Sequence, residues 1–122
     1  MSIVCICGST RFPQAHELAE LHETLLGNVV IPLAMYGHAD QPEGAKFLTS
    51  DGDENTVEKQ RIDGIHFKKI DIADEILVIN VAGYVGSSTK REIAHANAQG
   101  KPVRWLFESA APADLAAWLE EA

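Results

Sequence analysis

The residues of this chain best suited to chemistry lie in the stretch 83–92, which reads Gly-Tyr-Val-Gly-Ser-Ser-Thr-Lys-Arg-Glu. It follows an apolar, strand-like run and leads into a helix-like run from Glu92 to Gln99. A glycine-rich turn between a buried strand and a helix start can bind a phosphate or another anion, because backbone N–H groups point outward there and the helix dipole favours negative charge. The hydroxyls of Ser87, Ser88 and Thr89 add hydrogen-bond donors. We therefore predict an anion-binding loop in this stretch.

Glu92 allows two interpretations. In the first turn of the expected helix a carboxylate should stay ionised, and an ionised carboxylate beside an anion-binding loop is a candidate nucleophile. The spacing Thr89-Lys90-Arg91-Glu92 also fits a capping box, in which Glu92 only closes the end of the helix. The spacing alone leaves both interpretations open.

Length, composition and net charge limit the classes of protein to which this chain can belong. With 122 residues the chain can form one core, so we expect residues 1–122 to form a single domain. The net charge of −8 and the isoelectric point near 5.0 argue against binding to nucleic acid or to an anionic membrane, though not against a small anionic ligand. Met1-Ser2-Ile3-Val4 leads directly into a strand pattern, so we expect no signal peptide, no membrane span and a cytoplasmic protein.

The cysteines and most histidines give no metal motif. Cys5 and Cys7 are two apart in the first expected strand, so their side chains should project to the same face. This spacing is not C-x-x-C and no second pair completes a zinc site, so we predict reduced, buried core residues. His16, His22 and His95 have no convergent partners in the sequence and are interpreted as surface or packing residues. We therefore predict no metal site and no cofactor.

Apolar runs alternate with helix-like segments along the chain. Because the expected strands are apolar throughout, we expect a parallel sheet that helices cover on both faces. The predicted fold class is α/β, a flavodoxin-like or Rossmann-like three-layer sandwich with a small parallel sheet of four or five strands. The expected strands span 3–7, 29–31, 75–81 and 103–107, and the expected helices span 13–26, 56–73 and 92–99, with a last helix from Pro112.

Helical spacing of apolar residues predicts which helix faces are buried. His66 lies beside the apolar stripe of the helix over 56–73, near the edge of that stripe. The expected buried positions are Ala15, Leu18, Leu21, Leu25 and Leu26 in the first helix, Ile62, Ile65, Lys69, Ile70 and Ala73 in the second, and Leu115, Trp118 and Leu119 in the last.

The segment from Leu33 to about Asn55 has no helical or strand periodicity. A loop of this length tends to be a lid, a binding loop or disordered. Met35, Tyr36 and His38 could line a pocket or be ordinary surface or packing residues. The acidic run 51–54 lacks the ligand spacing of a calcium loop, so we interpret it as solvated.

A second candidate loop, Gly8-Ser9-Thr10-Arg11, leaves the first strand. Ligands of parallel α/β sheets bind at the carboxyl ends of the strands, where the strand order reverses, so this loop and the later one would line one crevice if their strands are neighbours. Arg11 could bind a ligand or be solvated, and Ser9 and Thr10 could bind a ligand or cap the helix. Asn80, at the end of the third strand, could bind a ligand or fix the loop.

Neither loop contains a common nucleotide-binding motif. There is no G-x-x-x-x-G-K-[ST], and no G-x-G-x-x-G with a following acid, so ATP hydrolysis and dinucleotide redox chemistry are disfavoured. Hydroxyls, Arg11, glycine amides and one carboxylate suit a phosphorylated sugar with a bond to be broken beside Glu92. A carboxylate can attack an anomeric carbon or stabilise an oxocarbenium-like transition state.

The opening Ile6-Cys7-Gly8-Ser9-Thr10-Arg11 resembles that of the nucleoside 2-deoxyribosyltransferase family, and the likeness covers most of the chain apart from 33–55. Ser88-Thr89-x-x-Glu92-Ile93-Ala94 and Gly100-Lys101-Pro102-Val103 are its most telling parts, and Ile70 with Ala73-Asp74 adds to them. The resemblance implies that Glu92 is the nucleophile on the anomeric carbon. It also implies a homodimer.

The chain departs from the family pattern at two positions. His66 stands where the transferases have a base-contacting Asp, and Gly86 stands where they have a sugar-binding Asp. The hydroxyl-rich loop is instead similar to that of the nucleoside 5′-monophosphate N-glycosidase branch, which implies phosphate contacts from Ser9 and from Ser87 or Ser88. A weaker likeness exists to phosphoribohydrolases of the cytokinin-activating type.

The sequence thus predicts cleavage or transfer at the N-glycosidic bond of a nucleoside or nucleoside 5′-monophosphate, with Glu92 as nucleophile. His66 is a candidate general acid for the departing base or a structural residue, and Tyr84 could contact the sugar or be a surface aromatic. The alternative is a nucleotide-binding or sensing module without catalysis, which the departures at His66 and Gly86 motivate. A purely structural domain fits the two hydroxyl-rich loops poorly.

Overall fold

The computed structural model of the chain describes residues 1–35 and 57–121. The expected loop over 33–55 lies outside the described residues from position 36 onward, together with Tyr36, His38 and the acidic run 51–54.

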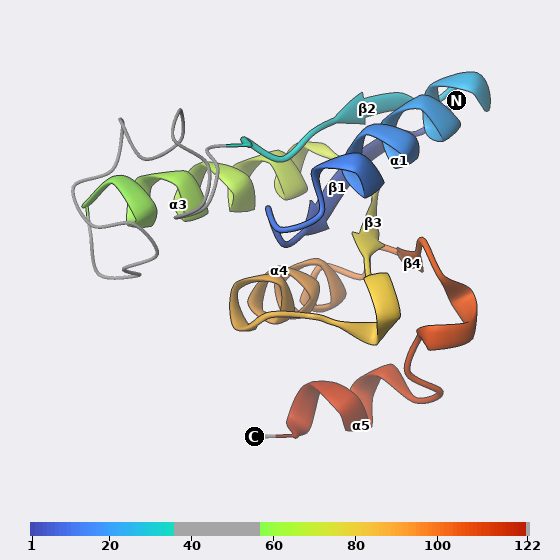
Figure 1. Cartoon of the computed structure of the whole chain (residues 1–122). Helices are drawn as coiled ribbons and strands as arrows, with labels where there is room; N and C mark the ends of the chain where they lie inside the picture. The colour runs from blue at the N-terminus through green and yellow to red at the C-terminus, as the bar shows by residue number, and fades with distance from the viewer. Residues whose placement is uncertain (36–56, 122) are drawn as a thin grey trace.

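The described strands form one parallel sheet (Figure 1). Strands β1 (Ile3–Gly8), β2 (Val29–Ile31), β3 (Glu75–Ile79) and β4 (Val103–Trp105) lie in the order β2-β1-β3-β4, and every pair is parallel. The chain moves outward from β1 to β2 and then crosses to the other side of β1, so the strand order reverses between β1 and β3. This confirms the predicted α/β fold with a small parallel sheet.

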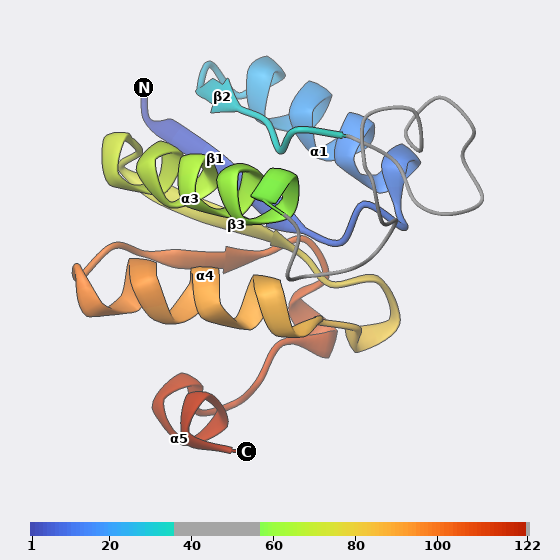
Figure 2. The ribbon, with the colours of Figure 1, turned by 90° about the vertical axis from the view of Figure 1, so that its left-hand side faces the viewer.

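Helices cover the sheet on both sides. Helix α1 (Pro13–Leu25) packs on one face, and helices α3 (Val57–Ile72) and α4 (Ser87–Ala98) lie side by side on the other, nearest the viewer in Figure 2. Helix α5 (Leu115–Glu120) begins after Asp114, whose carboxylate caps it, and its Leu115, Trp118 and Leu119 pack on the core as predicted. Two short 3-10 turns, Val81–Gly83 and Glu108–Ala110, follow β3 and β4.

Alternation along the central strands divides the core into two layers. Val4, Ile6, Leu77 and Ile79 face α1, whereas Cys5, Cys7, Ile76 and Val78 face α3 and α4. All of these side chains are buried, so the continuous apolar runs of the sequence reflect strands covered on both faces. The prediction that Cys5 and Cys7 share a face is confirmed.

Strands β1 and β3 are neighbours, and Gly8 pairs with Ile79 at their carboxyl ends. A Cβ atom at Gly8 would lie 2.6 Å from the Cβ of Ile79, closer than real Cβ atoms approach. Gly8 therefore lets the two strands approach at the point where both candidate loops leave the sheet.

The predicted buried face of α1 is wrong except at Ala15, which packs against the core. Leu18, Leu21 and Leu25 are exposed, as is Leu26 just beyond the helix. The buried positions are instead His16, Ala19 and Glu23, which repeat at i, i+3 and i+7. Periodicity of apolar residues selected the wrong face because two of the three buried side chains are polar and find partners inside the protein.

The position of His66 within α3 also differs from the prediction. The buried face runs through Lys59, His66 and Ile70 to Ala73, so His66 lies at the centre of this face and not at its edge, whereas Ile65 is exposed. The prediction from apolar residues alone misplaced the buried face of α3, because this face also carries Lys59 and His66.

Several element boundaries differ from the prediction, and α5 begins at Leu115, three positions after the expected start at Pro112. Helix α4 begins at Ser87, five positions before the expected start at Glu92, and β3 and β4 end at Ile79 and Trp105, two positions early. Within the two described ranges, no helix is long and apolar enough to cross a membrane.

Candidate active site

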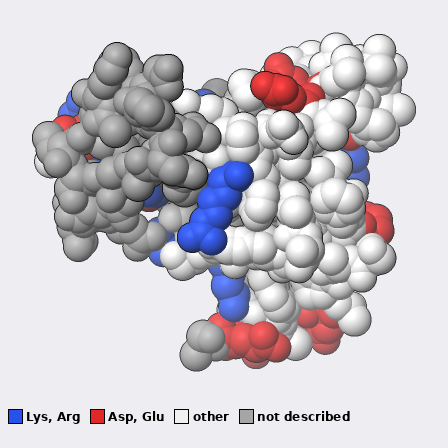
Figure 3. All heavy atoms as spheres, in the orientation of Figure 1, with Lys and Arg blue, Asp and Glu red and all other residues white. Residues whose placement is uncertain are grey.

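The two predicted loops meet at the carboxyl ends of β1 and β3. The Arg11 guanidinium carbon lies 4.9 Å from the ring centroid of Tyr84, and the rings of Phe12 and Tyr84 stand edge to face with centroids 5.9 Å apart. Lys and Arg side chains lie in the middle of the face shown in Figure 3, while most of its acidic side chains lie nearer the rim. Arg11 thus places a cation where the two loops meet, in a chain of net charge −8.

The side chains of Ser9 and His16 hold the backbone of the first loop. The Ser9 hydroxyl accepts a hydrogen bond from the Arg11 N–H at 3.1 Å, and the Ser9 carbonyl lies 3.0 Å from Nε2 of His16. Thr10 is buried. His16 therefore fixes the loop, in agreement with its predicted packing role, and the Ser9 hydroxyl keeps its proton as a donor.

Asn80 fixes the second loop. Its side-chain amide donates to the Phe107 carbonyl at 2.9 Å and accepts from the Phe107 N–H at 2.9 Å, and the residue is fully buried. Both ends of the amide are occupied, so the structure supports the loop-fixing interpretation of Asn80 over the ligand-binding one.

The Tyr84 hydroxyl lies close to Gly86 in the second loop. A Cβ atom at Gly86 would lie 3.3 Å from the Tyr84 hydroxyl oxygen. Tyr84 follows a tight turn in which Ala82 and Gly83 take positive φ values of 52° and 80°. The Tyr84 hydroxyl therefore occupies the space beside Gly86 where a side chain would begin.

Cationic side chains converge at the start of α4. The Ser88 hydroxyl accepts hydrogen bonds from Nη2 of Arg91 at 3.2 Å and from Nζ of Lys59 at 3.5 Å. Lys59 is nearly buried and also forms an ion pair with Asp63 at 2.6 Å. Gly86 is the N-cap, and as a glycine it has no side chain with which to cap the helix. The helix start, two cations and a serine hydroxyl thus form a candidate anion site.

The capping-box interpretation of Glu92 is wrong. Because α4 begins at Ser87, Thr89 lies inside the first turn and Glu92 lies in the second. Glu92 is only 5% exposed, and its Oε1 is a buried atom without a hydrogen-bond partner. Sequence spacing suggested a cap because it could not show that the helix starts five positions earlier.

The expectation that Glu92 stays ionised is also wrong. Burial raises the pKa of Glu92 to about 7, because the interior solvates the carboxylate poorly. The charge of His66 opposes this shift, and the charge of Asp63 adds to it. Glu92 therefore exchanges its proton near neutral pH.

The fold brings His66 to Glu92. Nε2 of His66 lies 3.8 Å from Oε1 of Glu92, and His66 is 2% exposed. Burial alone would lower the pKa of His66, but hydrogen bonding to Cys5 and the charge of Glu92 raise it overall. The two residues predicted to be catalytic therefore face each other as a close pair of titratable groups, beyond direct hydrogen-bond distance.

Two cysteines complete this cluster, and the sequence interpretation missed their contact with the site. Nε2 of His66 lies 3.7 Å from Sγ of Cys5 and 3.5 Å from Sγ of Cys7. Both thiols are buried and form no disulfide. A hydrogen bond between the two thiols, together with the nearby His66, lowers the pKa of Cys5 to about 5. The same hydrogen bond and burial raise the pKa of Cys7. The C-x-C spacing was the available signal.

A pocket of about 170 Å³ reaches His66 from the other side. It lies between α3 and the segment that follows β2, and its lining combines aliphatic side chains with His66 and two cationic residues. The lining residues are Leu33, Ala34, Arg61, Ile62, Ile65, His66 and Lys69.

The remaining histidines lie apart from this cluster. His22 is exposed beside Glu23, and Nε2 of His95 contacts Asp71 at 2.7 Å. His95 also packs against the ring of Phe67 at a centroid distance of 4.8 Å. These placements confirm their interpretation as surface or packing residues.

Comparison of the chain with protein-family models, with curated proteins and with solved structures gave no match.

Proposed function

We propose that this protein cleaves, or transfers across, the N-glycosidic bond of a nucleoside or nucleoside 5′-monophosphate, with Glu92 attacking the anomeric carbon. The observation that carries the proposal is the buried Oε1 of Glu92, which has no hydrogen-bond partner and lies 3.8 Å from Nε2 of His66. Burying a carboxylate oxygen without a hydrogen-bond partner costs folding free energy, and a bound ligand that contacts the oxygen would offset this cost.

In the proposed step the ionised Glu92 forms an ester bond to the anomeric carbon as the bond to the base breaks. The electron pair of that bond passes to the base nitrogen, which takes a proton from the His66 imidazolium. Water or another acceptor then attacks the same carbon, gives its proton to the now neutral His66, and releases Glu92 as a carboxylate. The raised pKa of His66 and the pKa of about 7 at Glu92 suit this exchange of roles near neutral pH.

The phosphate of a nucleotide would lie at the start of α4. Ser88 precedes Glu92 by one helical turn on the same side of the helix, a rise of about 6 Å that a pentose can bridge. Lys59 and Arg91 both donate to the Ser88 hydroxyl and would neutralise the phosphate. This convergence favours Ser88 over Ser9 as the main phosphate contact.

The departing base would occupy the pocket between α3 and the segment after β2. Its aliphatic walls suit a flat heterocycle, and His66 lies in the wall where a proton must reach the base. On the opposite side, the Tyr84 hydroxyl beside Gly86 would contact the sugar in place of the missing carboxylate.

Release of free base from a panel of deoxyribo- and ribonucleotides tests the proposal. We expect turnover with at least one monophosphate, and a Glu92→Gln variant should lose about 1,000-fold or more in rate. Glu17→Gln, on the exposed side of α1, is the matched control and should keep full activity. No release of base from any nucleotide or nucleoside in the panel would contradict the hydrolase form of the proposal.

The second candidate function is a nucleotide-binding or sensing module without catalysis. The raised pKa of Glu92 favours it, because a protonated carboxyl cannot attack carbon. Calorimetric binding of a nucleotide without turnover, unchanged in Glu92→Ala, would support this candidate over the enzyme.

A homodimer and a cytoplasmic location, which the resemblance and the sequence imply, remain part of the proposal. Sedimentation velocity measures the first, and a single species with the mass of one chain would contradict it.

A further inference from the structure

We propose that Cys5, Cys7, His66 and Glu92 together bind a zinc ion. This site goes beyond the proposed glycosidic chemistry and does not depend on it. The four side chains come from β1, α3 and α4 and converge in the core between the sheet and its two covering helices. The ligand atoms of Cys5, Cys7 and His66 all lie within 4.8 Å of one another.

The distances within the cluster match a tetrahedral zinc site. Zinc–sulfur bonds of about 2.3 Å and zinc–nitrogen bonds of about 2.0 Å place a thiolate and an imidazole nitrogen about 3.5 Å apart at the tetrahedral angle. Nε2 of His66 lies 3.5 Å from Sγ of Cys7 and 3.7 Å from Sγ of Cys5. An ion can therefore bind these three atoms with little rearrangement of the backbone.

Glu92 supplies the fourth ligand. Its Oε1 lies 3.8 Å from Nε2 of His66, where tetrahedral geometry asks for about 3.3 Å between a carboxylate oxygen and an imidazole nitrogen. This oxygen is buried and has no hydrogen-bond partner, which is an independent sign that it is poised for a ligand. A cation would offset the cost of burying the ionised carboxylate.

The donor set selects the kind of metal. Two thiolates and an imidazole are soft or borderline ligands that suit zinc, whereas magnesium and calcium require oxygen ligands. Zinc binds the thiolate forms of both cysteines, the neutral imidazole and the ionised carboxylate, so any protons that these four groups still carry pass to solvent on binding. The pocket that reaches His66 gives the ion a route to the site.

Bound zinc would withhold Glu92 from any sugar. If the proposed glycosidic activity holds, zinc should inhibit it, and chelation should restore it. This consequence alone rests on the proposed function.

Metal titration of the full chain tests the site without reference to activity. The chelator-treated protein should bind cobalt with a thiolate-to-metal charge-transfer band and the strong visible bands of tetrahedral cobalt, and zinc should bleach both. Cys7→Ser and Cys5→Ser should each weaken zinc binding about 100-fold or more, since loss of even an outer-shell partner costs about 10- to 100-fold. His95→Gln, which alters a half-buried histidine outside the cluster, should bind zinc unchanged.

X-ray absorption of the zinc-bound wild-type chain avoids any dependence on how the variants fold. It should give two sulfur scatterers at about 2.3 Å and two nitrogen or oxygen scatterers at about 2.0 Å. A shell of nitrogen and oxygen alone, or no zinc retained on dialysis, would overturn the site. Equal zinc affinity in Glu92→Gln would remove Glu92 from the ligand set.

Discussion

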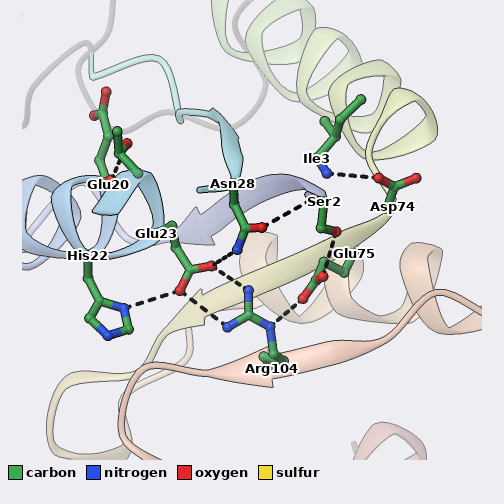
Figure 4. Close-up of polar contacts among 10 residues, drawn as sticks. Ser2, Ile3, Glu20, His22, Glu23, Asn28, Asp74, Glu75 and Arg104 are labelled. Atoms are coloured by element: carbon green, nitrogen blue, oxygen red, sulfur yellow. Dashed lines mark hydrogen bonds and ion pairs between the residues drawn. The ribbon is translucent and has the colours of Figure 1, made fainter. Parts of the chain in front are cut away.

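Two buried glutamates of this protein have opposite surroundings. Glu23, in α1, accepts hydrogen bonds from Arg104 at 2.6 and 3.2 Å and from Asn28 at 3.0 Å, with His22 at 3.3 Å (Figure 4). Glu92, in α4, has a buried oxygen without any partner. The pKa of Glu23 is lowered, first by its hydrogen bond with Arg104, whereas burial raises the pKa of Glu92 to about 7.

The two glutamates also differ in their place on the sheet. Glu23 belongs to a network near the strand starts, where Ser2 contacts Asn28 and Glu75, and Arg104 contacts Glu75 (Figure 4). Glu92 lies in the second turn of the helix that follows the β3 loop, among His66 and two thiols. One carboxylate is satisfied by the fold, and the other is left available for a ligand.

The largest stability effect should come from Glu23→Gln at pH 7. Arg104 loses the charge that both of its terminal nitrogens contact, so we expect the free energy of unfolding to fall by about 3 kcal/mol. The folded pKa of Glu23 is lowered, so its stabilisation is present above the unfolded pKa and is lost as the pH falls through the folded pKa. Urea unfolding at pH 7 and pH 3 measures this, and an equal loss at both values would contradict the ion-pair account.

The same substitution at Glu92 should have the opposite sign. The folded pKa of Glu92 is raised to about 7, so the metal-free protein loses stability as the pH rises from the unfolded pKa through 7. Glu92→Gln removes the buried charge and should raise the free energy of unfolding by about 2 kcal/mol at pH 8. Below pH 4.5 the variant and the parent should agree closely. A destabilised Glu92→Gln at pH 8 would break the comparison between the two glutamates.

Two glycines near the carboxyl ends of the strands should differ in how much an added methyl group destabilises the protein. Gly8→Ala forces a Cβ against Ile79 and should cost about 1–3 kcal/mol in unfolding free energy. Gly86→Ala meets only the hydroxyl end of Tyr84, so it should cost less than about 0.5 kcal/mol. Thermal unfolding of both variants checks this order, and the reverse order would contradict the strand packing described for Gly8.

The smallest effect should come from Tyr84→Phe. The ring still packs on Phe12 and Arg11, so the unfolding midpoint should not change. Loss of the hydroxyl should weaken binding of the nucleotide about 5- to 10-fold, the worth of one ordinary hydrogen bond. Calorimetry measures the change, and unchanged affinity would remove Tyr84 from the proposed sugar site.

The sequence predicted the sheet and most elements correctly because apolar strands and helix-ending residues are local signals. It predicted the fold class, the shared face of Cys5 and Cys7, and Pro13 at the first position of α1. It failed for the buried face of α1, because Glu23 is buried against Arg104, which is remote in sequence, and His16 is buried against the Ser9 carbonyl of the preceding loop, and apolar periodicity shows neither contact.

The candidate site was partly predictable for the same reason. The carboxyl-end loops and Glu92 follow from strand–loop–helix spacing. The contact of His66 with Glu92 depends on how α3 and α4 pack, and the pKa of Glu92 depends on that burial. Lys59 was missed because a lysine on a helix usually lies on the solvent side, although its spacing of seven positions from His66 places both on one face.

Covalent trapping tests the central proposal, that Glu92 attacks an anomeric carbon, most directly. A 2′-fluoro nucleoside monophosphate slows breakdown of a glycosyl ester, so intact-mass and peptide mass spectrometry of the metal-free chain should find one sugar phosphate on the peptide that carries Glu92. Glu92→Gln should form no adduct. Release of base with the adduct on another residue, or undiminished release by Glu92→Gln, would contradict the account.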